Sequence, residues 1–132
     1  MDKDFILNCI HFCDQVIVNR NNNNSTIVNI FDTINARNFP ALRPMLTIFC
    51  NVAGKERGSY RIEVRIKDCD GSEAIGVATG PLEIKLDGGE ANFIANFLNV
   101  IFKKGGKYPV EIKIDSKTLD NKEYFLIVKE GM

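Results

Sequence analysis

The sequence of 132 residues contains one histidine, no tryptophan and no excess of either charge sign. Lysine plus arginine and aspartate plus glutamate number 17 each, so the formal net charge is zero at pH 7. A chain without a basic excess produces no long-range field that attracts nucleic acid or an anionic membrane surface. The charge balance therefore predicts that neither nucleic acid nor a membrane is a partner.

Long apolar runs are missing as well. No stretch approaches the roughly 20 apolar residues that a membrane-spanning helix needs. Residues 1–11 carry two acids beside one lysine, and Asn8 and His11 interrupt a short apolar run, which is not the pattern of a signal peptide. We therefore expect a cytoplasmic protein whose cysteines stay reduced and behave as small buried apolar residues, namely Cys9, Cys13, Cys50 and Cys69.

The sequence also lacks the common catalytic signatures. It contains no G-x-S-x-G elbow, no P-loop and no dinucleotide-binding fingerprint. A Cys-His or Ser-His pair would have to use the single histidine, His11. We therefore assign no catalytic residue, no cofactor-binding residue, no metal ligand and no cofactor from the sequence.

The clearest structural signal that is present lies between residues 58 and 71. Apolar residues occupy every second position there and charged residues occupy the positions between, as expected for a strand with one buried face. Residues 106–114 repeat this design, and each segment opens on a tyrosine, Tyr60 or Tyr108. A tyrosine ring at a strand entrance, with its hydroxyl bonded to the backbone, is the tyrosine corner of Greek-key sandwiches.

Other strands follow from β-branched content and turn residues. Residues 5–12 are apolar at both parities, which predicts a central strand or one covered on both faces, continuing through 15–19. The asparagine-rich segment 20–24 predicts a hairpin loop, and residues 25–32 predict the returning strand. Further predictions are an extended loop crossing between sheets at 33–44, a hairpin of 45–52 with the strand from 58, a kinked strand over 73–86, and a last strand at 123–129 paired with 106–114.

Residues 91–102 are ambiguous, because their apolar positions also recur at helical spacing. Three asparagines, the lack of helix-favouring charges and the following Lys-Lys-Gly-Gly segment favour a strand. Together the segments predict an all-β protein, an immunoglobulin-like antiparallel β-sandwich of about seven to nine strands in a single domain over residues 1–132.

Several segments together resemble a widespread family of small uncharacterised bacterial β-sandwich proteins. The resemblance runs over nearly the whole chain and implies an immunoglobulin-like sandwich without an established activity, substrate or cofactor. In that family a histidine often precedes the second proline, where this sequence has Arg43. The segments that carry the resemblance are residues 12–16, 27–34, 39–40, 43–44, 58–60, 68–71 and 106–108.

One cluster of residues could carry metal chemistry. Cys9, His11 and Cys13 stand at alternate positions of the first predicted strand, so their side chains would project from one face. Cys50 or Cys69 could add a fourth soft ligand, as tetrahedral zinc requires. Structural zinc sites, however, usually draw on C-x-x-C turns, which this sequence lacks. Buried cysteines beside a hydrogen-bonded histidine are the favoured interpretation.

Two charged segments have simpler explanations. Asp68, Asp70 and Glu73 imitate the start of a calcium loop, but no closing acid follows, so a polar hairpin turn is favoured. A possible basic strip contains acids among its members, which favours cross-strand ion pairs over nucleic-acid binding. Its basic residues are Arg61, Arg65, Lys67, Lys107 and Lys113, and its acids are Glu63 and Glu111.

The function remains unknown from the sequence, and two hypotheses from different classes stay open. The favoured one is a non-enzymatic β-sandwich that acts by binding another protein or a second copy of itself, through an edge strand or the loop 39–44. The alternative is a small metal-dependent or cysteine-based enzyme centred on Cys9, His11 and Cys13.

Overall fold

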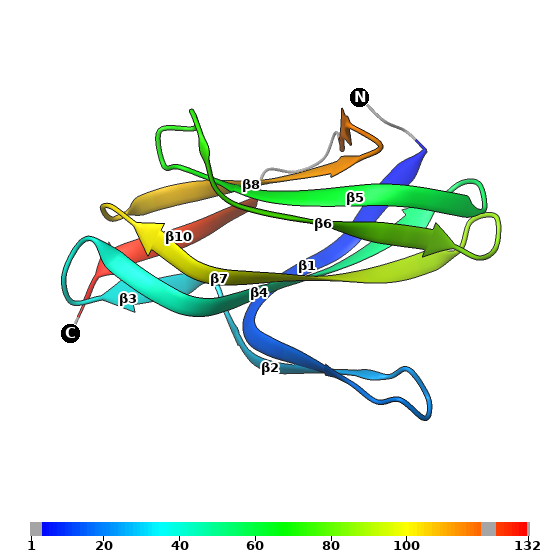
Figure 1. The fold of residues 1–132 in the computed structure, drawn as a ribbon, viewed down its shortest axis with the longest axis horizontal. Coiled ribbons are helices and arrows are strands. Elements are labelled where there is room, and N and C mark those ends of the chain that lie inside the picture. The colour runs from blue at the N-terminus through cyan, green and yellow to red at the C-terminus, as the bar shows by residue number, and fades with distance from the viewer. Residues whose placement is uncertain (1–3, 120–123, 132) are drawn as a thin grey trace.

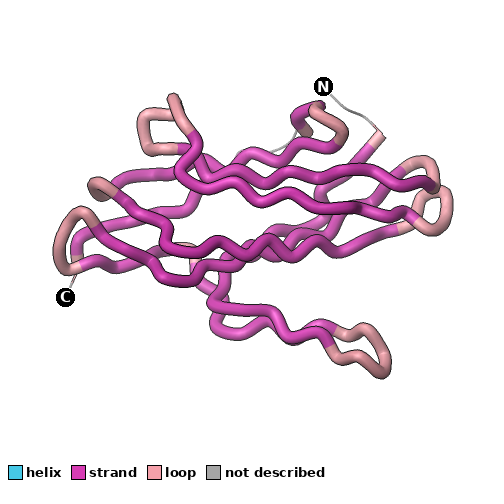
Figure 2. The backbone as a smooth tube through the Cα atoms, in the orientation of Figure 1, coloured by secondary structure: helices cyan, strands magenta, loops and turns pink. Residues whose placement is uncertain are grey.

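The computed structural model describes residues 4–119 and 124–131, and every regular element in these residues is a strand (Figures 1 and 2). In the described residues there is no helix with the length and apolar content needed to cross a membrane. The strands are β1 (Phe5–Val18), β2 (Ser25–Phe31), β3 (Thr33–Ala36), β4 (Ala41–Gly54), β5 (Gly58–Lys67), β6 (Ala74–Ile84), β7 (Glu90–Phe102), β8 (Gly106–Ile114), β9 (Lys117–Thr118) and β10 (Tyr124–Glu130).

The strands form two sheets that enclose one apolar core (Figure 1). Sheet A has the order β2-β1-β4-β7, and sheet B has the order β3-β10-β8-β5-β6, with the short β9 paired to β8. Sheet B is curled into a half-barrel. The all-β prediction is confirmed. The described residues form ten strands, and the sequence pattern predicted seven to nine because it did not reveal the short strands β3 and β9.

The two tyrosine-led strands, β5 and β8, are neighbours in the middle of sheet B. Val64 of β5 pairs with Ile112 of β8, and these side chains are 0% and 5% exposed. The alternating pattern thus identified the buried face correctly, since every second residue of each strand lies in the core.

Both tyrosines form the expected corner. The Tyr60 hydroxyl donates to the carbonyl of Glu56 at 2.9 Å, and the Tyr108 hydroxyl donates to the carbonyl of Lys104. Each ring also meets a phenylalanine of sheet A edge to face, Phe5 for Tyr60 at 4.8 Å and Phe102 for Tyr108 at 4.9 Å between ring centroids. The repeated segments therefore tie sheet B to sheet A at two places.

The predicted crossing loop over residues 33–44 is wrong in part. Its first residues form β3, which pairs in parallel with β10, and β4 already begins at Ala41. The missing amide of Pro44 is tolerated because Pro44 faces Asn99, where the β4–β7 ladder is interrupted and the backbone of Asn99 is left-handed with φ 55°. The crossing itself is confirmed, because this segment leaves sheet A, enters sheet B and returns.

The predicted hairpin between residues 45–52 and the strand from residue 58 is wrong. β4 lies in sheet A and β5 in sheet B, so the connection crosses the core instead of folding back within one sheet. Both strands present apolar side chains to the same core from opposite sides. The sequence did not distinguish a hairpin within one sheet from a connection between the two sheets, because a short turn is compatible with both. β4 is central between β1 and β7, and five consecutive residues, 46–50, are buried.

Residues 91–102 form a strand, as favoured, and the structure explains their helical spacing. Ala95 and Phe97 point into the core at alternate positions of β7. The left-handed Asn99 then shifts the alternation, so that Val100 and Phe102 face the core instead of Asn99 and Ile101. A kinked strand therefore reproduces the apolar spacing of a helix.

Most other predictions of elements are confirmed. β1 is a central strand and forms a hairpin with β2 around residues 19–24. The β5–β6 register shifts beside Gly76, as the predicted kink requires, and Pro81 lies in the edge strand β6. β10 pairs with β8 as expected, although residues 120–123 of that connection and strand start lie outside the described residues.

Removing the Tyr108 hydroxyl tests the tyrosine corners. We expect Tyr108→Phe to lower the free energy of unfolding by about 1 kcal/mol, because a buried hydrogen bond to Lys104 is lost. Tyr60→Phe removes the equivalent bond at a more exposed position and should cost less. Urea unfolding of both variants measures the difference. An equal loss of stability, or a larger loss for Tyr60→Phe, would contradict the expectation that the Tyr108 hydrogen bond stabilises the fold more than the Tyr60 hydrogen bond.

Candidate interaction surface

The two sheets differ sharply in charge. The four strands of sheet A contain three charged residues, Asp14, Arg43 and Glu90, and the first two form an ion pair. The strands of sheet B contain eleven, which is the normal pattern of a solvated face. Those eleven are Arg61, Glu63, Arg65, Lys67, Glu83, Lys107, Glu111, Lys113, Lys117, Lys129 and Glu130.

Exposed apolar side chains are distributed in the opposite way. Of the ten large apolar residues that are most exposed in the described chain, eight belong to strands of sheet A. Scattered single apolar residues on a surface need no explanation, whereas a concentration on one face marks a contact surface. The eight are Ile6, Ile17, Val18, Ile30, Leu42, Met45, Leu98 and Ile101.

Four of these residues form two cross-strand pairs, which we call the β4–β7 patch. Leu42 pairs with Ile101 and Met45 pairs with Leu98 in the β4–β7 ladder. They alternate with core residues such as Leu46 and Phe102, so they point away from sheet B. Leu98 is 69% exposed, which leaves most of its side chain in water. The patch is therefore an apolar surface that no described part of the chain covers.

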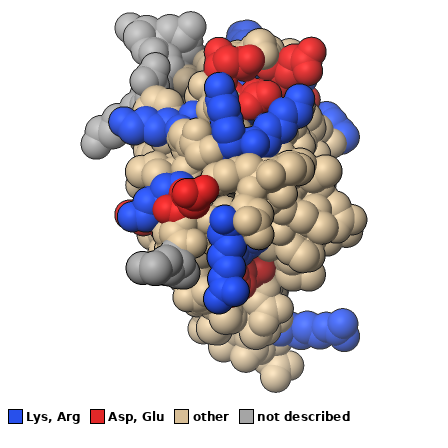
Figure 3. All heavy atoms as spheres, turned by 90° about the vertical axis from the view of Figure 1, so that its left-hand side faces the viewer, with Lys and Arg blue, Asp and Glu red and all other residues tan. Residues whose placement is uncertain are grey.

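The second uncovered region is a hairpin arm. The β1–β4 ladder ends at Cys13 and Thr47, after which β1 pairs with β2 alone. Residues 14–29, the arm, project from the body of the molecule on the side of sheet A that faces away from sheet B (Figure 1). Ile17 and Val18 on the arm are 52% and 44% exposed. Seen end-on, the lowest part of the molecule, where the arm lies, is mainly uncharged (Figure 3).

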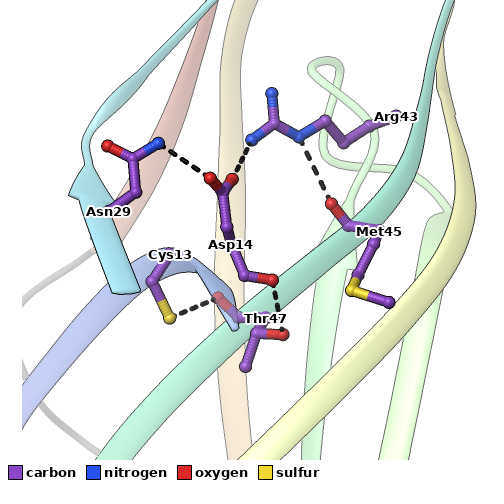
Figure 4. Close-up of polar contacts among 6 residues, drawn as sticks. All are labelled: Cys13, Asp14, Asn29, Arg43, Met45 and Thr47. Atoms are coloured by element: carbon purple, nitrogen blue, oxygen red, sulfur yellow. Dashed lines mark hydrogen bonds and ion pairs between the residues drawn. The ribbon is translucent and has the colours of Figure 1, made fainter. Parts of the chain in front are cut away.

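Polar contacts fix the base of the arm (Figure 4). The carboxylate of Asp14 accepts hydrogen bonds from Arg43 at 2.7 Å and from the side-chain amide of Asn29 at 2.8 Å. Asn29 faces Asp14 across the hairpin in a left-handed conformation, φ 56°, and so bends β2 at this point. The Arg43 guanidinium also lies 4.8 Å from the ring centre of Phe31. One carboxylate therefore joins β1, β2 and β4.

Two buried groups continue this junction into sheet A. Thr47 is completely buried, and its hydroxyl lies 2.9 Å from Oδ1 of Asn96 and 3.3 Å from the carbonyl oxygen of Asp14. The thiol of Cys13 donates to the carbonyl of Thr47 at 3.6 Å. We use the name arm base for six residues, namely Cys13, Asp14, Asn29, Arg43, Thr47 and Asn96. Its hydrogen bonds set where β1 leaves β4.

The opposite half of the outer face of sheet A is polar and consists mainly of asparagine amides beside the carboxylate of Glu90. The side-chain amide of Asn8 donates to Oδ1 of Asn51, and the amide of Asn51 donates to Oδ1 of Asn92, each at 2.8 Å. This ladder of amides satisfies its own hydrogen bonds across three strands. Apart from Ile6 and Ile30, the exposed large apolar residues of sheet A lie in the β4–β7 patch and the arm.

A comparison with protein-family models matches residues 8–127 to a family of unknown function, DUF6941. The matched range includes the arm, the arm base and the β4–β7 patch. The chain belongs to the DUF6941 family. A comparison with curated proteins finds no match to this chain. Membership of DUF6941 brings no known activity, substrate or cofactor to the residues described above.

Two of the segments that suggested a family resemblance meet at the arm base. Residues 12–16 contribute Cys13 and Asp14, and residues 43–44 contribute Arg43. The sequence pattern showed that Arg43 occupies a position where histidine was expected, but it did not show a partner. The structure supplies the partner, since Asp14 lies 29 positions away along the chain and binds Arg43 directly.

The DUF6941 chain places Cys9, His11 and Cys13 on one face of β1, as predicted, since they pair with alternate residues of β4. The described residues contain no group of three or more histidine, cysteine, aspartate or glutamate side chains that could hold a metal ion. His11 instead stacks on Phe49, with ring centroids 6.4 Å apart.

Two of the thiols are unsuited to nucleophilic chemistry. Burial, followed by the nearby Cys9, raises the pKa of Cys50 to about 12, and Cys50 points into the core. Burial, followed by the charge of Asp14, also raises the pKa of Cys13. A reactive cysteine needs a lowered pKa, so these environments act in the wrong direction. Cys69 lies beside Gly106 in sheet B, away from β1.

The predicted hairpin turn at Asp68–Glu73 is confirmed. The amide of Gly71 donates to the carbonyl of Asp68, and Gly71 takes a left-handed φ of 77°. The carboxylate of Asp70 accepts hydrogen bonds from the hydroxyl and the amide of Ser72, and these bonds lower the pKa of Asp70. The aspartate thus completes a turn.

The basic residues of sheet B are interleaved with acids, as expected. Lys67 and Lys113 both approach Glu111, at 3.9 and 3.8 Å, and Arg65 binds Glu63 at 2.6 Å. The first of these pairs joins neighbouring strands, whereas the other two join residues of one strand. A shallow hollow of about 530 Å³ on this face is lined by charges of both signs.

Loss of the Asp14 carboxylate should loosen the arm without unfolding the sandwich. We expect Asp14→Ala to speed amide hydrogen exchange in residues 14–29 by several-fold while lowering the free energy of unfolding by less than about 1 kcal/mol, because the pair is partly exposed. Glu63→Ala removes an ion pair of similar length from sheet B and serves as the control. Unchanged exchange in the arm would show that Asp14 does not hold it.

Alkylation tests the thiol environments. In the native protein at pH 8, iodoacetamide should leave Cys13 and Cys50 unmodified, because both are buried and their pKa values are raised. Both should react once the chain is unfolded in urea. Mass spectrometry of the peptides identifies the modified residues. Fast native labelling of Cys13 would restore the hypothesis of a cysteine-based enzyme.

Proposed function

We propose that this DUF6941 chain is a non-enzymatic protein-interaction module, and that the β4–β7 patch is its main contact surface. The observation that carries the proposal is the pairing of Leu42 with Ile101 and of Met45 with Leu98 on an uncharged, uncovered sheet face. Such side chains gain free energy only when a partner removes them from water.

The chemistry of the surface supports an uncharged protein partner. Nucleic acid and anionic membranes bind through lysine and arginine, and the strands of sheet A contain only Arg43, which Asp14 neutralises. A protein segment with its own apolar side chains can cover the β4–β7 patch, whose four members carry no charge. The proposal accordingly includes neither nucleic acid nor a membrane, and it places the protein in the cytoplasm.

We favour a binding role over an enzymatic one because the candidate catalytic residues are poorly placed for catalysis. His11 is stacked on Phe49, and the thiols of Cys13 and Cys50 are buried with raised pKa values. Two packed sheets with a crossing connection and two tyrosine corners support assignment to the immunoglobulin-like class, in one domain over residues 1–132. Domains of that class commonly bind other proteins through a sheet face or a sheet edge.

A matched pair of lysine substitutions tests the patch. Leu98 and Leu86 are 69% and 70% exposed, but Leu98 lies in the β4–β7 patch and Leu86 in the turn before β7. We expect Leu98→Lys to abolish retention of the partner in affinity capture from native lysate, while Leu86→Lys retains it. Both variants should keep the thermal stability of the parent protein, because neither side chain belongs to the core.

The partner captured by the parent protein is identified by mass spectrometry and then purified for a direct binding assay. In that assay Leu98→Lys should weaken binding by about tenfold or more, since an apolar contact is replaced by a charge. Equal binding by the parent protein and Leu98→Lys would refute the role of the patch. A parent protein that retains no partner would count against the binding module itself.

A further inference from the structure

β2 is an edge strand without a charged residue or a proline, although Asn29 bends it near its end. It is the last strand of sheet A and pairs only with β1, so one row of its backbone groups has no ladder partner in the described structure. Natural proteins usually protect such an edge with lysine, proline or an inward-pointing charge. The sequence of β2, Ser-Thr-Ile-Val-Asn-Ile-Phe, contains none of these.

The arm that carries this edge is only two strands wide. A two-stranded ribbon is at best marginally stable in water, and a third strand is usually needed. The arm nevertheless projects from the body of the molecule (Figure 1), and its residues Ile17 and Val18, together with Ile30 beside the arm, are about half exposed. Its geometry fits a state in which another strand lies along β2.

The edge strand on the other side of sheet A, β7, packs closely against sheet B. The rings of Phe93 and Phe97 in β7 lie so close to β6 that a Cβ atom added at Gly80 or Gly76 would be 2.7 or 2.9 Å from them. The glycines of β6 therefore let β7 pack against sheet B.

We propose that a second copy of this chain supplies the missing strand, with β2 of one copy pairing antiparallel to β2 of the other across a twofold axis. Full overlap of the seven residues puts Val28 next to the axis, opposite its own equivalent. Thr26 then lies opposite Ile30 of the other copy, and such β-branched pairs are favourable. Because residues 21–31 carry no charge, no like charges meet.

Charge complementarity selects a second copy over an unrelated strand. In this overlap the tip of one arm lies beside the base of the other. Arg20 at the tip has no ion-pair partner among the described residues. Asp32, directly after β2, is exposed, and its carboxylate accepts a hydrogen bond from the Thr33 hydroxyl. The twofold axis brings Arg20 of each copy toward Asp32 of the other, so the contact forms twice.

The pairing is closed, because both copies use the same edge strand in an isologous contact. It joins two copies of sheet A into one continuous sheet and leaves both β4–β7 patches free. This dimer is independent of the proposed function. A dimer would present two patches, and a monomer could still bind a partner through one.

Sedimentation equilibrium over a micromolar to millimolar concentration series tests the proposal. The parent protein should dimerise, and Ile30→Lys should raise the dimer dissociation constant by about tenfold or more, because it places a charge on the paired edge. Leu86→Lys, a substitution at a comparably exposed leucine outside the arm, is the control and should dimerise like the parent. Amides of β2 should exchange more slowly in the dimer than after dilution to the monomer.

Charge reversal tests the antiparallel register and does not alter the strands themselves. Arg20→Glu and Asp32→Arg should each weaken dimerisation by about tenfold, since two symmetry-related contacts are lost. The double variant Arg20→Glu, Asp32→Arg should restore the dissociation constant of the parent, because the opposite charges meet again. These positions lie outside β2, so the test still applies if Ile30→Lys fails to fold.

A parent protein that remains monomeric throughout the series would overturn the proposal. A dimer that resists both Ile30→Lys and charge reversal would overturn it as well, because the contact would then lie elsewhere. Leu98→Lys should leave the dimer intact. A monomer that still captures a partner through Leu98 would therefore reject the second copy while leaving the proposed function standing.

Discussion

The structure depends on how β1 is shared between two parts of the molecule. Its first half pairs with β4 in sheet A, its second half pairs with β2 in the arm, and only Phe12 and Cys13 pair with both strands. The carboxylate of Asp14 stands at this division and holds Arg43 of β4 and Asn29 of β2. Because three strands meet at one charged group, the direction in which the arm leaves the sandwich is determined there.

Two asparagines with left-handed backbone allow sheet A to divide in this way. Asn29 bends β2 opposite Asp14, and Asn99 bends β7 opposite Pro44. Asparagine tolerates this conformation better than most residues, so neither bend requires a glycine. The bends are close to each other, since Arg43, beside Pro44, contacts Asp14. Beyond this line β4 and β7 continue along the core while β1 and β2 leave it (Figure 1).

The two sheets carry out different tasks. Sheet B exposes charged residues that pair with one another, which keeps its outer face in water. Sheet A carries almost no charge, satisfies part of its outer face with the amide ladder from Asn8 to Asn92, and leaves apolar side chains uncovered on the remainder. In the DUF6941 chain the charged outer face of sheet B is therefore the solvated surface, and the apolar part of the outer face of sheet A is the candidate contact surface.

Much of the fold could be predicted from local pattern. The alternation in β5 and β8 identified the buried faces, and the asparagine-rich loop identified the β1–β2 hairpin, because both signals depend on neighbouring residues. The candidate surface could not be found in this way. Leu98 and Ile101 look like core residues in the sequence. Leu98 points outward because it alternates with Phe97, and the left-handed Asn99 then places Ile101 on the same outer side.

By itself the sequence determined the strand content, the hairpin at residues 19–24 and the two tyrosine corners, since these follow from periodicity and turn chemistry over a few residues. Only the tertiary structure decided which strands share a sheet. It separated β4 from β5, made a strand of Thr33–Ala36, and brought Arg43 to Asp14. The physical reason is that an apolar strand packs equally well beside or across the core, so its partners are chosen by the whole set of contacts and not by its own residues.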